Sequence, residues 1–199
     1  HLVLGLAKNT YGYLEDADLF DPLFFSISPL DAQRMDPQQR LFLQEAYHAF
    51  EHAGYAPSRL AGVRCGVYLG LCNNDYAMVA RAAGHEVADR LGNSNAVAAS
   101  RIAYHLDLRG PAMTIDTACS SSLVCVHQAS LALLAGEIDM AVAGAVTLHL
   151  APELFVCWSG SGMLSPDGRC RTFDNDANGF VPGEAVGAVV LKRLDDAVR

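Results

Sequence analysis

The feature that most constrains the fold of this chain is a run between residues 120 and 136 without a single charged side chain. A helix in this run would be apolar on nearly all of its sides, and such a helix has to be buried. With about 15 residues and a length of roughly 22 Å, it suits the middle of a substantial core. A short apolar run, residues 113–117, comes just before it. The sequence therefore predicts a buried strand that leads through a tight turn into a buried helix.

Further apolar runs predict buried strands at residues 63–71, 140–146 and 185–191. Helices are expected at residues 37–53, 76–91 and about 95–106. In the first of these helices Asp36 is the predicted N-cap, Pro37 suits the first position, Gln39 completes a pattern like a capping box, and Gly54 ends the helix. Strands that alternate with helices, in a chain that is 51% hydrophobic, indicate an α/β layered fold with covered sheets.

The charge and the cysteines exclude several classes of protein. A net charge of −8 argues against binding of nucleic acid, which requires a basic face. No apolar run reaches the ~18 residues of a membrane-spanning helix. The six cysteines form no Cys-X-X-Cys pair, which disfavours a zinc site and a disulfide framework. Most of these thiols are expected to be inert core residues, in a protein of the reducing cytoplasm.

Cys119 is the exception, because it lies where the predicted strand turns into the apolar helix. The unpaired N–H groups and the positive end of the helix dipole favour a thiolate there, and the thiolate is the nucleophilic form. Such a turn presents its side chain as a nucleophile elbow does. The small neighbours Ala118 and Ser120 would leave room for a thioester. The alternative is a buried structural cysteine next to serines that cap a helix.

The residues around Cys119 read Asp-Thr-Ala-Cys-Ser-Ser-Ser, and this segment resembles the active-site signature of the β-ketoacyl synthases. The resemblance covers nearly the whole chain and is strongest to the ketosynthases of type I modular polyketide synthases. Its other matching segments, in the expected order, are residues 20–29, 34–40, 99–104, 163–174 and 183–193.

The resemblance implies a thiolase-like fold with α-β-α-β-α layers, built from two similar halves around the helix of the nucleophile. Residues 1–199 would then be a partial domain, mainly the N-terminal half, without the first strand and without the C-terminal half. The family also implies a homodimer in which the strand before Cys119 lies close to the two-fold axis. The partners implied are an acyl carrier protein and other modules of a polyketide synthase.

The chemistry that the resemblance implies has two stages. Cys119 first accepts an acyl chain from a phosphopantetheine thioester, and its backbone N–H contributes to the oxyanion hole. A malonyl-type extender on the acyl carrier protein then loses carbon dioxide, and its carbanion attacks the acyl-cysteine. No bound cofactor or metal is expected, because the phosphopantetheine of the carrier protein holds the substrates.

Four other residues are candidates for supporting roles. Glu184 matches a glutamate of the family near the active-site side, where its role is either functional or to brace a turn. Asp116 is expected to support the turn by bonding backbone groups rather than to act as a catalytic carboxylate. Met163 and Phe180 are candidates to border the acyl channel, with core packing as the default interpretation.

The second stage needs two histidines, the first in a His-Gly-Thr motif, and none of the seven histidines precedes Gly-Thr. The chain alone is therefore expected to be inactive. His127, about 12 Å along the helix from Cys119, is too far away to be its base, which disfavours a cysteine hydrolase. The open alternatives are a ketosynthase that transfers chains without condensing them, and a dimerisation or docking scaffold. Thiolases share the fold but lack the serine-rich flank.

Overall fold

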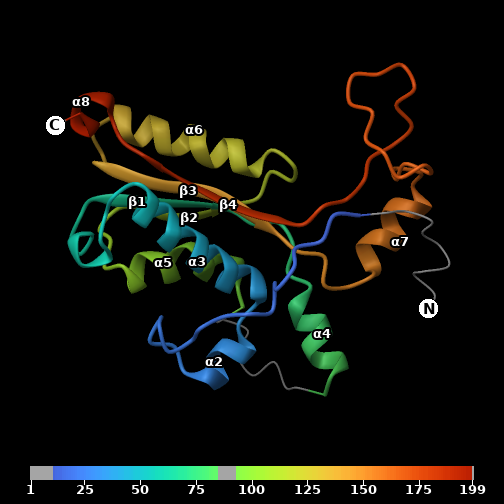
Figure 1. The fold of residues 1–199 in the computed structure, drawn as a ribbon, viewed down its shortest axis with the longest axis horizontal. Helices are drawn as coiled ribbons and strands as arrows, with labels where there is room; N and C mark the ends of the chain where they lie inside the picture. The colour runs from blue at the N-terminus through green and yellow to red at the C-terminus, as the bar shows by residue number, and fades with distance from the viewer. Residues whose placement is uncertain (1–10, 85–92, 199) are drawn as a thin grey trace.

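The computed structural model describes residues 11–84 and 93–198, and its centre is a mixed four-stranded sheet in the order β2-β1-β3-β4 (Figure 1). β1 pairs in parallel with both β2 and β3, whereas β4 is antiparallel to β3. The strands are β1 (Cys65–Gly70), β2 (Ala112–Ile115), β3 (Met140–Thr147) and β4 (Ala185–Leu191). The expected strands at 140–146 and 185–191 are thus confirmed, and the antiparallel direction of β4 was not foreseen.

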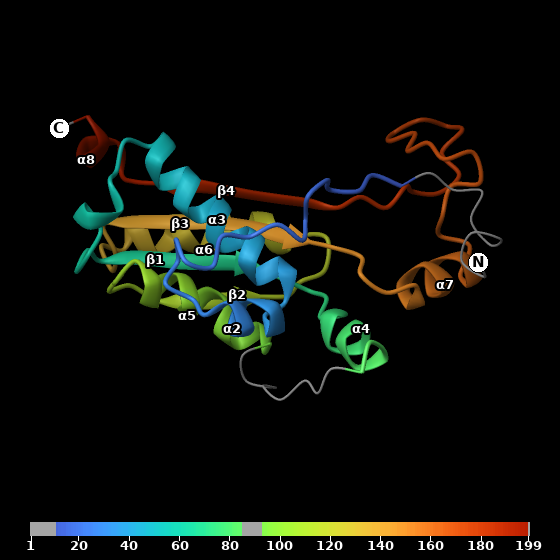
Figure 2. The ribbon, with the colours of Figure 1, turned by 60° about the horizontal axis from the view of Figure 1, so that its bottom comes forward.

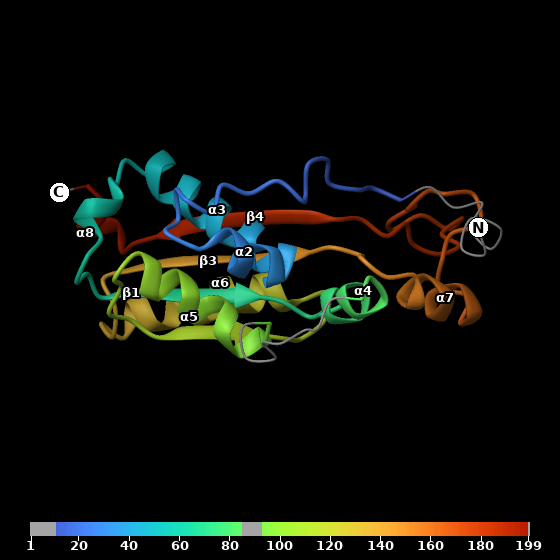
Figure 3. The same ribbon diagram turned by 90° about the horizontal axis from the view of Figure 1, so that it is seen from below.

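Helices cover the two faces of this sheet unequally, as Figures 2 and 3 show. α3 (Pro37–His52) and α5 (Asn95–His105) lie on one face, and α6 (Ser121–Leu134) lies on the other. The shorter helices are α2 (Pro29–Arg34), α4 (Tyr76–Ala82), α7 (Glu153–Gly160) and α8 (Leu194–Ala197), with a 3-10 turn at Pro57–Arg59. The helix expected at 76–91 is therefore much shorter, and residues 85–91 of that prediction lie outside the described residues.

The alternation of side chains along the strands explains the two faces. Large apolar residues of β1 and β3, among them Val67, Leu69 and Val142, pack with Phe42 and Phe50 of α3. The opposite face carries one large residue, Tyr68, and otherwise glycine and alanine in β1 and β3. The small residues let α6 approach the sheet closely.

The start of α3 confirms the predicted N-cap and corrects the predicted capping box. The carboxylate of Asp36 accepts a hydrogen bond from the backbone N–H of Gln38 at 2.8 Å. The backbone N–H of Asp36, however, donates to the side chain of Asn93 at 2.7 Å. The Gln39 amide points to the carbonyl of Ser94 instead. Asn93, which is 57 positions away, therefore binds the backbone N–H of Asp36 in place of Gln39.

α6 is less enclosed than its composition predicts. Its inward face consists of small residues, mainly Ser121, Cys125 and Ala129, which are buried against the sheet. Leu123 and Leu134 are 74% and 79% exposed on the opposite side. The described residues cover only one side of α6, and burial of its other side in a complete domain stays a prediction.

The two edge strands are also partly exposed within the described residues. β2 has no neighbour on its outer side in the described sheet, and Met113 is 40% exposed. β4 is covered by α3 on one face only, so that its outward residues, such as Val189, remain exposed. Within the described part of the chain, no helix is long and apolar enough to span a membrane.

The end of β4 is tied to α6 by one arginine. The guanidinium of Arg193 donates to the carbonyls of Leu133 and Ile138, at 2.9 and 2.7 Å. It also pairs with Asp139 at 3.0 Å and with Asp196 at 2.6 Å. The carbonyl of Leu133 in the last turn of α6 thereby accepts a second hydrogen bond, beside that from the N–H of Gly136, from a distant residue.

Candidate active site

Cys119 lies in a tight turn between β2 and α6, two residues before the first residue of the helix. Ala118 adopts a left-handed conformation with φ of 56°, and Thr117 and Cys119 form an isolated bridge. The turn leaves the Cys119 side chain exposed. In Figure 3 the start of α6 lies at the same edge of the sheet as α4 and the segment leading to α7, where the parallel strands end. This edge is where open α/β sheets bind their ligands.

Hydrogen bonds from both sides hold the turn. The carboxylate of Asp116 accepts the N–H of Ala118 at 3.0 Å, and this bond lowers the pKa of Asp116. The hydroxyl of Ser121 accepts the N–H of Thr117 at 2.9 Å and donates to the carbonyl of Ala118 at 2.7 Å. Ser120 donates to Thr117 at 2.8 Å. The left-handed residue is therefore fixed by the side chains of its own loop and of the first residue of α6.

β1 fixes the distance of this turn from the sheet. A Cβ atom added to Gly70 would lie 3.0 Å from the Cβ of Ser121 and 2.9 Å from the Cβ of Ala145. The last residue of β1 must therefore be very small for the first turn of α6 to pack here. Because Ser121 also bonds the turn, the contact at Gly70 sets the position of Cys119 relative to the sheet.

The six cysteines divide by exposure, and all are free thiols. Cys65 and Cys125 are buried, and burial raises their pKa values to about 12 and about 11, so that both remain protonated at neutral pH. Cys72, Cys119, Cys157 and Cys170 are exposed. The expectation that most of the thiols are core residues is wrong, because four of the six lie at turns or on a helix surface.

Glu184 connects three segments of the chain by hydrogen bonds. Its carboxylate accepts the backbone N–H groups of Leu14, at 3.0 Å, and His149, at 2.8 Å. Its own N–H donates to the carbonyl of Gly12 at 2.8 Å. The N-terminal segment, the loop after β3 and the entry to β4 therefore meet at one carboxylate. Glu184 thus has a structural role, since both of its carboxylate oxygens bind backbone N–H groups.

Replacement of Glu184 by glutamine should lower the free energy of unfolding by about 1–3 kcal/mol, because the amide cannot accept both N–H groups and leaves one without a partner. Urea denaturation of the complete domain would measure the loss. Glu51→Gln, at an exposed position of α3, is the matched control and should change stability by less than about 0.5 kcal/mol. Equal effects of the two substitutions would contradict the bracing role.

Met163 and Phe180 lie beside each other in the long segment between α7 and β4. The N–H of Phe180 donates to the carbonyl of Met163 at 3.0 Å, and the Phe180 ring packs edge-on against Trp158 at 5.4 Å. Met163 is 48% exposed, which is incompatible with its default interpretation as a core residue. Trp158 in turn contacts Phe155 and His149, so that an aromatic cluster links α7 to the loop after β3.

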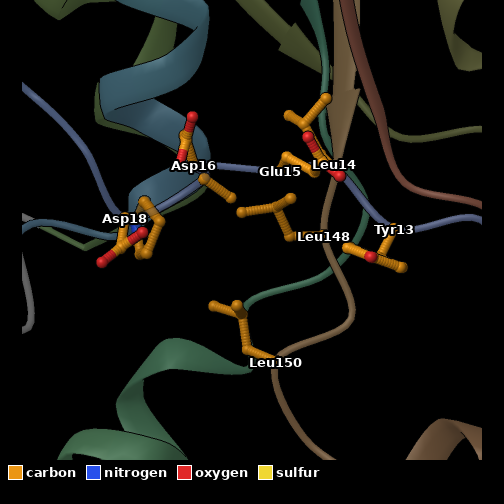
Figure 4. Close-up of a pocket in the computed structure, with 9 residues that line it drawn as sticks. Tyr13, Leu14, Glu15, Asp16, Asp18, Leu148 and Leu150 are labelled. Atoms are coloured by element: carbon orange, nitrogen blue, oxygen red, sulfur yellow. The ribbon is translucent and has the colours of Figure 1, made fainter.

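A pocket of about 450 Å³ opens between the N-terminal segment and the loop after β3 (Figure 4). It is lined by residues 13–18, Pro37, Leu148 and Leu150. Cys119 and the residues of its turn are not among those that line it. The pocket is therefore separate from the nucleophile.

The sequence did not draw attention to Cys72, which follows β1 and reaches the turn of Cys119. Its sulfur lies 3.5 Å from the carbonyl oxygen of Ala118 and 3.3 Å from the hydroxyl of Ser121. The position of Cys72 just past an expected strand could have marked it only if β1 and β2 had been known to be neighbours. His127 lies on an exposed position of α6. Across residues 11–84 and 93–198, no group of three or more His, Cys, Asp or Glu side chains is placed to hold a metal ion.

The sequence of the chain matches a known protein family. Residues 3–197 match the family described as "Beta-ketoacyl synthase, N-terminal domain". The chain is 56% identical over 186 residues to polyketide synthase PksL of Bacillus subtilis, with 94% of this chain and 4% of that protein covered. It is 48% identical over 190 residues to a phenolphthiocerol/phthiocerol polyketide synthase of Mycobacterium tuberculosis, with 94% and 12% covered.

Solved structures agree with these sequence matches. The ketosynthase from module 6 of the bacillaene synthase of Bacillus subtilis superimposes with a TM-score of 0.86 at 56% identity, over 93% of this chain and 31% of that one. An oxazolomycin ketosynthase domain of Streptomyces albus gives the same TM-score at 40% identity, over 94% and 34%. The chain thus spans about a third of the ketosynthases whose fold it shares.

Proposed function

The chain belongs to the β-ketoacyl synthase family, with the thiolase-like fold of its polyketide synthase ketosynthases, and we propose that Cys119 is the thiol that carries the growing acyl chain. The observation that carries this proposal is the turn itself. Cys119 is exposed, follows a left-handed residue and precedes a helix whose first N–H groups lack intrahelical partners. Each of these features favours a nucleophilic thiol.

In the first stage the Cys119 sulfur attacks the carbonyl carbon of an acyl-phosphopantetheine thioester. A new C–S bond forms, the old one breaks, and the phosphopantetheine thiol leaves with a proton. The backbone N–H of Cys119 stabilises the negative oxygen that develops in between. In the second stage a malonyl-type extender loses carbon dioxide, and its carbanion displaces the sulfur to form a β-ketoacyl product. This stage uses the two histidines that the family supplies from its C-terminal half.

The uneven covering of α6 supports an arrangement in two halves. Leu123, Leu131 and Leu134 are exposed on the side away from the sheet, and we place the second half of the ketosynthase there. The free edge of β2 is the face we assign to the two-fold axis of a homodimer. An acyl carrier protein and neighbouring modules are the proposed partners in the cytoplasm. Without the second half, this part alone is expected to be inactive.

Mass spectrometry tests the proposal directly. The complete domain is incubated with an acyl-pantetheine thioester, and the acylated peptide is identified. We expect a single acyl group on Cys119, while the exposed thiols Cys72, Cys157 and Cys170 stay free. Malonyl carrier protein is then added, and the acyl group should leave Cys119 as a β-ketoacyl product.

Two outcomes would contradict parts of this proposal. Acyl groups spread over the exposed cysteines would contradict the role of Cys119. Acylation of Cys119 without any condensation would favour a ketosynthase that only transfers chains.

A further inference from the structure

The carbonyl oxygen of Ala118 receives an unusual number of donors. The backbone N–H of Ser121 lies 3.1 Å from it, the Ser121 hydroxyl 2.7 Å, and the Cys72 sulfur 3.5 Å. The Cys72 sulfur also lies 3.3 Å from that hydroxyl, and the Asp116 carboxylate is a third acceptor within reach of its single proton. Two of the three donors belong to Ser121, the first residue of α6, and the third comes from the segment that follows the neighbouring strand β1.

This carbonyl belongs to the same peptide unit as the N–H of Cys119. The unit is planar and trans, so that its N–H points opposite to its C=O. Groups that fix the oxygen of Ala118 therefore fix the direction of the Cys119 N–H as well. Donors on the oxygen also polarise the amide and make its N–H a stronger hydrogen-bond donor.

Cys72 is in the right chemical form for this task. Partial desolvation of the sulfur raises its pKa, although the residue as a whole is exposed. At neutral pH Cys72 is therefore a thiol with a proton to donate, and not a thiolate. Cys72 lies two residues past the end of β1, so the bond also couples the turn to the centre of the sheet.

We propose that Cys72 is a positioning residue, which orients the Cys119 N–H toward the oxygen that becomes negative during acyl transfer. The inference rests on the proposed function, since it assigns a role to Cys72 in the acylation of Cys119. The Cys72 thiol contacts neither the substrate nor the reacting atoms in this role, and acts through the peptide unit between Ala118 and Cys119.

The decisive comparison is between two reactions of the same thiol in Cys72→Ala. Acyl transfer to Cys119 builds a negative oxygen, whereas alkylation by iodoacetamide does not. In the complete domain we expect acylation by an acyl-pantetheine thioester to slow by about three- to tenfold, since a weak S–H donor that supports an oxyanion donor is lost. The thioester concentration that gives half-maximal rate should not change. The rate of Cys119 alkylation, followed by peptide mass spectrometry, should change by less than about twofold, since no oxyanion forms.

Two further variants complete the test. Cys72→Ser keeps a donor and should acylate within about twofold of the unchanged protein. Cys157→Ala removes another exposed thiol, on α7, and should leave both reactions unchanged. Unaltered acylation in Cys72→Ala would overturn the inference, and so would equal slowing of acylation and alkylation, which would indicate a displaced sulfur. Failure of the unchanged protein to acylate Cys119 would overturn the proposed function itself.

Discussion

Replacement of Cys119 by alanine should abolish condensation, with a loss of about 10⁴–10⁶-fold in the complete domain. No other thiol can take over the reaction. Cys65 and Cys125 are buried with raised pKa values, and the remaining exposed thiols do not precede a helix from a left-handed turn. The measurement is the formation of β-ketoacyl product from acyl and malonyl carrier-protein thioesters.

The matched control for this experiment is Cys157→Ala, which removes an exposed thiol from α7 and should retain full activity. Thermal melts should show that Cys119→Ala remains folded, since the exposed side chain contributes little packing. Residual product above one thousandth of the original rate in the alanine variant would show that another group accepts the acyl chain.

Replacement of Gly144 by alanine should destabilise the domain by about 3 kcal/mol, the upper end of the usual cost of overpacking, because the new methyl group has no room. A Cβ atom there would lie 2.0 Å from the carbonyl oxygen of Gly187 and 2.9 Å from both the Cα of Ala188 and the ring of Phe42. Two of these three obstacles are backbone atoms, so β3 and β4 would have to separate locally. The free energy of unfolding in urea would measure the effect.

Gly187→Ala provides the control in the adjacent strand. Nothing lies within 4 Å of a Cβ atom at Gly187, and its backbone is not left-handed. This substitution should change stability by no more than about 1 kcal/mol, with a small gain from reduced freedom of the unfolded chain. Similar behaviour of the two glycine variants would show that the β3–β4 interface is looser than the structure describes.

The strands and the helix of the nucleophile were predictable because their signals are local. Residues 185–191 form an uninterrupted apolar run, and β4 has these bounds. The N-cap at Asp36 followed from the Asp-Pro pair. The partner of the Asp36 N–H did not, because Asn93 comes from a distant loop. Hydropathy also could not show that the leucines of α6 point away from the sheet, since it records apolar character and not direction.

The nucleophile of the candidate site could be predicted from the sequence, whereas the residues that position it could not. Cys119 follows from its position between strand and helix together with the surrounding signature. The contact of Cys72 with Ala118 depends on β1 and β2 being neighbours, which the spacing of the runs does not specify. The carboxylate of Glu184 could be placed near the site, but its two backbone partners lie 170 and 35 positions away.

The bonds of Arg193 have a consequence for the order of events during translation. Ile138 leaves the ribosome 55 residues before the arginine that binds its carbonyl, an interval of about 3–11 s at typical synthesis rates. During this interval β3 has no β4 beside it, and its backbone groups form an open edge that can pair with other nascent chains. Of the described strands β4 is synthesised last, and it is the one that pairs with this edge of β3.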